Sequence, residues 1–199
     1  MLSLPTGKYH SSVEVDPFPC YAHNNAVVEA EVRDIEAKID LPFKPRYFVL
    51  PYEGASRTNG YADGNEYHGE NPQPYIVLQG KRICIHPAIT RYLVAHEFGH
   101  VVQVNLQHFL KLKWDEFCEF YAKEVRKIPY EKRYGGLHWH INTGEIIAND
   151  IRVGVLGKEA EFWPHEVAHP WAVPHVSEWW RQMFAEHFVP KPEPIKTTA

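Results

Sequence analysis

The chain of 199 residues is long enough for one substantial hydrophobic core and short for two, so a single domain spanning 1–199 is expected. Six tryptophans favour a packed globule, and a net charge of -4 without clustered basic residues excludes a typical nucleic-acid-binding protein. The sequence has neither a signal-peptide-like start nor an apolar run of membrane-spanning length, which predicts a cytoplasmic protein without a membrane partner.

The chain begins with a segment that shows no clear periodicity. Prolines interrupt residues 1–23, and we expect an irregular arm there that packs against the body. Asn24 or Asn25 is a suitable N-cap for a helix, because apolar residues follow at helical spacing. That helix is predicted to end before Pro42.

A short sheet is predicted next. Residues 46–52 (RYFVLPY) are rich in β-branched and aromatic side chains and predict a strand, whereas residues 53–74 predict a long loop rich in Gly and Asn. Residues 75–86 then predict a β-hairpin, with Gly80 in its turn. The expected fold class is therefore α+β, with a short, mostly antiparallel sheet whose hairpin edge can receive an extended peptide.

The pentad His96-Glu97-Phe98-Gly99-His100 lies in an apolar run that predicts a long buried helix from about Pro87 to Phe109. On a helix, His96 and His100 lie four residues apart on one side, so both imidazoles can reach one metal ion. Glu97 is placed to hold a water on that metal, which is the arrangement of a zinc site with a built-in general base. A pair of buried polar residues is the alternative.

The segment after this helix supplies candidates for a catalytic donor. Residues 114–128 predict a second amphipathic helix that packs on the first. Residues 130–140 (YEKRYGGLHWH) follow, and peptide hydrolysis through zinc requires a donor to the oxyanion. Tyr134, His138 and His140 are suitable by type, with His140 preferred for its proximity to the next helix.

A third metal ligand is expected in the segment 142–151 (NTGEIIANDI). Thr143 can cap a helix there, and Glu145 would then face the core one turn into an apolar helix, where a cation would offset its burial. Asn149 lies one turn further and can orient Glu145 or a ligand imidazole. Asp150, about 140° around the axis from Glu145, is expected at the surface or in helix packing.

A second match to the pentad pattern, His165 to His169, is flanked by Pro164 and Pro170. Because Pro170 prevents a helix from continuing, a solvated loop is the favoured interpretation. A helix is predicted over 176–188, and residues 189–199 (VPKPEPIKTTA) predict a flexible tail.

The HEFGH pentad followed by EIIAND resembles the gluzincin pattern H-E-x-x-H…E, and its E-x-x-A-N portion is similar to compact metallopeptidases of the phage-repressor-cleaving, IrrE-like group. The resemblance covers about residues 76–156. It implies a small zincin fold with the metal where two helices cross beneath a sheet edge. It also implies ligand roles for His96, His100 and Glu145 and a base role for Glu97. The metzincin pattern matches less well, because residues 101–106 lack its glycine and third histidine.

The sequence therefore predicts a zinc metallopeptidase, with an endopeptidase favoured over an exopeptidase, that holds one Zn²⁺ and acts on a peptide or protein substrate. Three alternatives remain. The first is a catalytically inactive zinc-binding or interaction protein that keeps the same scaffold, the second a metal-free helical adaptor, and the third a metal-dependent hydrolase of another bond. The oligomeric state is not predicted.

Overall fold

The computed structural model describes residues 14–15, 22–50, 60–65, 72–79, 87–129, 142–154 and 168–188. In chain order the elements are β1 (Glu14–Val15), α1 (Ala22–Glu36), β2 (Arg46–Leu50), β3 (Gly60–Asn65), β4 (Gln73–Gln79), α3 (Pro87–Leu110), α4 (Trp114–Phe120), the π-helix η2 (Tyr121–Val125), α6 (Thr143–Gly154), the 3-10 helix η4 (Pro170–Ala172) and α7 (Pro174–His187). Apart from α1, which lies between β1 and β2, the helices follow the one small sheet along the chain, which is an α+β arrangement. None of the described helices is both long and apolar enough to cross a membrane.

The sheet is mixed, with the strand order β1-β2-β4-β3. β1 pairs with β2 and β2 with β4 in parallel, whereas β3 pairs with β4 in antiparallel orientation. The prediction of a mostly antiparallel sheet is therefore wrong, because two of these three pairings are parallel. β4 lies between two partners in the interior of the sheet, and β3 forms the edge of its described part. The second strand of the predicted hairpin 75–86 falls outside the described residues.

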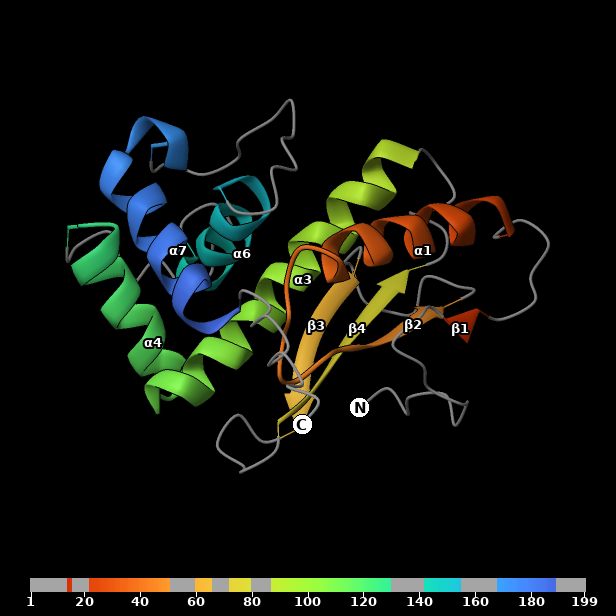
Figure 1. Cartoon of the computed structure of the whole chain (residues 1–199), viewed down its shortest axis with the longest axis horizontal. Helices are drawn as coiled ribbons and strands as arrows, with labels where there is room; N and C mark the ends of the chain where they lie inside the picture. Colours follow the sequence, from red (N-terminus) through yellow and green to blue (C-terminus); the bar gives the residue numbers. More distant parts are fainter. Residues whose placement is uncertain are drawn as a thin grey trace, which may run out of the picture.

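The central element is α3, which contacts α1, α6, β3 and β4. Its side chains are buried nearly all round from residue 93 to residue 107, and Val94, Phe98, Val101 and Leu106 are fully enclosed. A helix with apolar residues on several sides is stable only when other elements cover them, which explains its position in the middle of the molecule. In Figure 1, α4, α6 and α7 gather on the side of α3 away from the strands. The predicted motif helix is confirmed in kind and extent.

Several predicted boundaries differ from the structure. α1 begins at Ala22 and ends at Glu36, and β1 interrupts the predicted irregular arm 1–23. The predicted loop 53–74 contains β3, which sequence reasoning missed. The predicted helix 114–128 is divided into α4 and η2, and the last predicted helix begins at Pro174. The tail 189–199 lies outside the described residues.

Candidate metal centre

The candidate site forms where α3 and α6 pass unusually close to each other. The contact centres on Gly99, between the two histidines of the pentad, and Ala148 of α6. A Cβ atom on Gly99 would lie 2.5 Å from the backbone oxygen of Ala148 and 2.7 Å from its Cα. Only glycine permits this approach, because real Cβ atoms do not come so close to a backbone. The missing side chain therefore brings the first turn of α6 within reach of both imidazoles.

Two imidazoles and a carboxylate converge at this crossing. One ligand atom from each of His96, His100 and Glu145 lies within 4.8 Å of the other two. The Nε2 atom of His96 is 3.0 Å from Glu145 Oε2, and Nε2 of His100 is 3.8 Å from Glu145 Oε1. Ligand atoms on a tetrahedral zinc ion are about 3.4 Å apart, given zinc-ligand distances near 2.1 Å. These two separations bracket that value, so the three side chains can hold a metal ion.

The two histidines differ in their electrostatic environment. Burial, together with the charge of the neighbouring His96, lowers the pKa of His100 to about 4, so this ring is neutral at pH 7. Burial also lowers the pKa of His96, but the hydrogen bond that its ring donates to Glu145 and the charges of Glu97 and Glu145 outweigh it, so the net shift is upward. Glu145 and Glu97 therefore favour the protonated form of His96. A bound metal would displace that proton and balance the charge of Glu145 in its place.

Glu97 lies beside the three-residue group and is not part of it. Its side chain is buried, and burial raises its pKa to about 7, with His96 lowering it and Glu145 raising it. The backbone N–H of Ala62 in β3 also hydrogen-bonds this carboxylate and lowers the pKa. A carboxylate with a pKa near neutrality can both accept and return a proton at pH 7.

Asn149 connects the helix of Glu145 to the ring of His96. Its Oδ1 atom lies 3.2 Å from Nδ1 of His96, on the opposite side of the ring from Glu145. Its Nδ2 donates to the backbone oxygen of Glu145 over 3.1 Å. Asn149 therefore orients the imidazole from behind, as expected from its place one turn after Glu145.

The other candidate residues either fall outside the described part of the chain or lie away from this group. Tyr134, His138 and His140 lie outside the described residues, as does all of the second pentad except its last two positions. Within the described part of the chain, His96, His100 and Glu145 are the one group of ligand-type side chains close enough to share a metal, and His169 is not among them. Asp150 is fully buried in helix packing, so the surface alternative for it is wrong.

Sequence reasoning missed three neighbours of the site. Trp114, at the start of α4, lies with its ring 6.2 Å from that of His100 and packs against Gly144. Tyr92 stacks on His96 at 6.0 Å, and Arg152 contacts Asn149. Tyr92 precedes His96 by four residues and Arg152 follows Asn149 by three, so helical spacing contained a signal for these two residues. The position of Trp114 beside the site depends on tertiary packing, so the sequence contained no signal for it.

Comparison with known proteins yields no relative for this chain: no protein-family model, curated protein or solved structure matches it.

Proposed function

We propose that this protein is a zinc-dependent peptidase of the gluzincin type, with an endopeptidase favoured. The observation that carries the proposal is the convergence of His96, His100 and Glu145 around one point, with Glu97 buried beside them. Two neutral imidazole nitrogens and one carboxylate form a donor set typical of catalytic zinc, which leaves a fourth position open. The group His96-His100-Glu145 is called the metal centre below.

Zinc bound at this centre would polarise a carbonyl group and lower the pKa of a bound water. The chain's own contribution is the proton transfer. Glu97, with its pKa raised to about 7 by burial, accepts a proton from the attacking water and delivers it to the leaving amine. The same buried carboxylate would be poorly suited as a structural residue, because its burial in the charged form is costly.

The position of β3 supports a peptide as the substrate. β4 has partners on both sides, so the predicted hairpin edge cannot receive a substrate strand along β4. β3 lies at the edge of the described sheet, contacts α3, and places Ala62 against Glu97. An extended peptide added to this edge would pass close to the metal centre, and its backbone would supply the hydrogen bonds. Tyr134, His138 and His140 remain the candidate donors to the oxyanion.

The test begins with the metal content of protein purified without a histidine tag. We expect about one equivalent of zinc, as for a single site with three protein ligands. A digest of an unbiased peptide library, read by mass spectrometry, should show internal cleavage. Removal of zinc with a chelator should abolish this cleavage, and addition of zinc should restore it.

Glu97→Gln separates the peptidase from an inactive zinc-binding protein on the same scaffold. It keeps the shape of the side chain and removes the base, so zinc should stay bound while the rate falls by several orders of magnitude. Glu124→Gln makes the same chemical change at an exposed position of η2 and should leave the rate unchanged. Full activity of Glu97→Gln would refute the proposed mechanism, and zinc far below one equivalent in the wild-type protein would favour the metal-free adaptor.

A further inference from the structure

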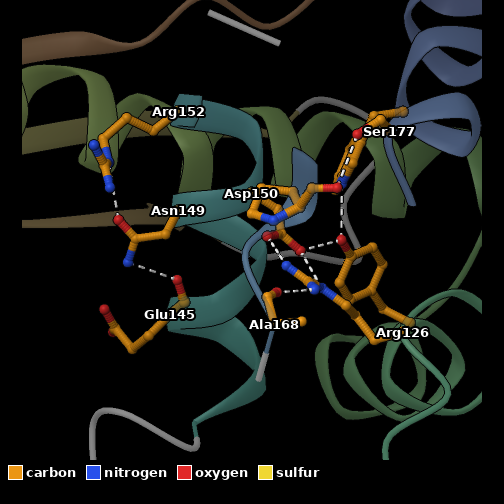
Figure 2. Close-up of polar contacts among 10 residues, drawn as sticks. Arg126, Glu145, Asn149, Asp150, Arg152, Ala168 and Ser177 are labelled. Atoms are coloured by element: carbon orange, nitrogen blue, oxygen red, sulfur yellow. Dashed lines mark hydrogen bonds and ion pairs between the residues drawn. The ribbon is translucent and has the colours of Figure 1, made fainter. Parts of the chain in front are cut away.

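A buried guanidinium lies behind the metal centre. Arg152, on α6, has 1% of its surface exposed, and it shares a helix face with Asn149 and Glu145 (Figure 2). Its Nε donates to Asn149 Oδ1 over 2.9 Å. Its guanidinium carbon lies 4.3 Å from the centre of the Tyr92 ring, a cation–π contact. Burying a guanidinium lowers its pKa and costs free energy, so its retention here needs a reason.

The contact with Arg152 fixes the orientation of the Asn149 amide. An amide side chain has a donating and an accepting end of nearly equal size, and either can occupy a given position. A guanidinium only donates. If the amide were reversed, Nδ2 would face Arg152 Nε with both groups as donors, and its bond to the Glu145 backbone oxygen would be lost. The hydroxyl of Tyr92 also donates to Asn149 Oδ1, over 3.4 Å.

The orientation of Asn149 in turn fixes the state of His96. An amide oxygen only accepts, so the nitrogen that faces it, Nδ1 of His96, must carry a hydrogen. In the neutral ring the lone pair then resides on Nε2. Nε2 is the atom that faces Glu145 at 3.0 Å. The chain of contacts thus places the lone pair of His96 where a metal ligand requires it.

We propose that Arg152, held against the ring of Tyr92, is a positioning residue that sets the His96 tautomer through Asn149 and so strengthens metal binding. In this proposal Arg152 acts through Asn149, to which its Nε donates. The proposal rests on the metal-binding part of the proposed function and is independent of which bond the enzyme cleaves.

The test compares Arg152→Met with Arg152→Gln. Methionine has similar length and no donor, whereas glutamine keeps a nitrogen donor on the same Cδ atom that bears Nε in arginine. We expect Arg152→Met to weaken zinc binding roughly 10- to 100-fold, the usual effect of losing an outer-shell partner. Arg152→Gln should recover most of that loss. Zinc affinity is measured by competition with a chromophoric chelator.

A second readout does not depend on zinc. In the metal-free protein, ¹⁵N NMR of the imidazole nitrogens reports which atom of His96 carries the proton. The wild-type ring should be protonated at Nδ1 whenever it is neutral, and Arg152→Met should give a mixture of tautomers. If Arg152→Met keeps both the wild-type zinc affinity and the wild-type tautomer, the proposal is wrong. If the wild-type protein binds no zinc, the proposed function fails, and the tautomer measurement still decides the role of Arg152.

Two further variants control for stability and charge. Should Arg152→Met fail to fold, Tyr92→Leu removes the stacking surface and leaves the arginine in place. We then expect a smaller loss of zinc affinity and a mixture of His96 tautomers. An unchanged tautomer would overturn the proposal.

Arg91→Met removes an exposed arginine next to Tyr92 in the sequence and should leave zinc affinity and the His96 tautomer unchanged. An effect of Arg91→Met equal to that of Arg152→Met would assign the result to net charge and overturn the proposal.

Discussion

Two faces of α6 carry carboxylates, one fully buried and one partly buried, that lie in opposite chemical situations (Figure 2). On one face, both oxygens of Asp150 are hydrogen-bonded by the guanidinium of Arg126, and the hydroxyl of Tyr121 donates to Oδ2. Arg126 also donates to the backbone oxygen of Ala168, and Trp180 donates to Tyr121. Burial lowers the pKa of Arg126, but Asp150 and Tyr121 together raise it more, so the guanidinium keeps its charge. This set of residues is called the Asp150 cluster.

On the other face, Glu145 meets imidazoles, whose charge depends on a proton or a metal. The Asp150 cluster carries a permanent cation within the chain, so it can hold η2, α6 and the segment before η4 together without a ligand. The metal centre has no such permanent cation among its three members. The difference separates a carboxylate buried for stability from one placed for binding, although only four residues lie between them in the sequence.

The largest effect is expected for Asp150→Asn. It leaves the buried guanidinium of Arg126 without its countercharge, which typically costs about 3–5 kcal/mol of unfolding free energy. Chemical denaturation of the metal-free protein measures this loss. Zinc affinity of the fraction that remains folded should change little. A loss below about 1 kcal/mol would show that the Asp150 cluster does not stabilise the protein as argued.

The next largest effect on the unfolding free energy is expected from the titration of Glu97 as the pH changes. Burial raises its pKa from 4.5 in the unfolded chain to about 7 in the folded one. Its contribution to stability is thus fully present below pH 4.5 and is lost as pH rises through 7, by up to about 3 kcal/mol. His100, whose folded pKa is lowered to about 4, acts in the opposite direction between pH 4 and 6.5.

The Glu97 contribution is isolated by subtracting the stability of Glu97→Gln from that of the metal-free wild-type protein at each pH. Because both proteins contain His100, its contribution cancels in this difference. The difference should fall between pH 4.5 and 8. A flat difference would mean that the folded carboxyl titrates as it does in water.

A smaller loss is expected for Gly99→Ala, which places a methyl group 2.5 Å from the Ala148 oxygen and forces α6 away from α3. Overpacking of this kind costs about 1–3 kcal/mol. The displacement also moves Glu145 from the imidazoles, so zinc affinity should fall at least 10-fold, as when ligand geometry is disturbed. Gly154→Ala is the matched control, because its Cβ would meet nothing closer than 4.0 Å. Equal zinc affinity in the two variants would contradict the close-crossing argument.

The sequence predicted α3 and the convergence of its histidines with Glu145 because the patterns that indicate them lie within single helices. Helical spacing places His96 beside His100, and a buried acid on an apolar helix requires a positive partner. The same reasoning could not find the partner of Asp150. Arg126 directly follows the π-helix η2, and the wider turn of η2 sets the direction of the Arg126 side chain. The spacing of hydrophobic residues in the sequence does not predict a π-helical turn.

The sheet was harder to predict for a related reason. The residues of β3 (GYADGN) include two glycines, an aspartate and an asparagine, which have low strand propensity. This strand is stabilised by its pairing with β4 and by the contact of Ala62 with Glu97, both of which link distant parts of the chain. The parallel pairing of β2 with β4 likewise depends on the path of the segment that connects them. The pattern of residues within each strand does not indicate that path.

The smallest effect on stability, and the sharpest test of the comparison, is expected for Glu145→Gln. Since the imidazoles that face Glu145 can lose their charge with a proton, removing the charge of Glu145 should change the unfolding free energy of the metal-free protein by no more than about 1 kcal/mol, the range typical of weakly paired charges. With zinc the result reverses. A ligand at 100 times its dissociation constant stabilises the folded state by about 2.7 kcal/mol, and this gain should largely vanish in Glu145→Gln, because zinc loses one of three ligands. Asp150→Asn, by contrast, should keep the zinc-dependent gain while starting from a much less stable protein. Thermal unfolding of both variants with and without zinc therefore gives opposite patterns if one face of α6 serves binding and the other stability, and the same pattern in both variants would remove the distinction.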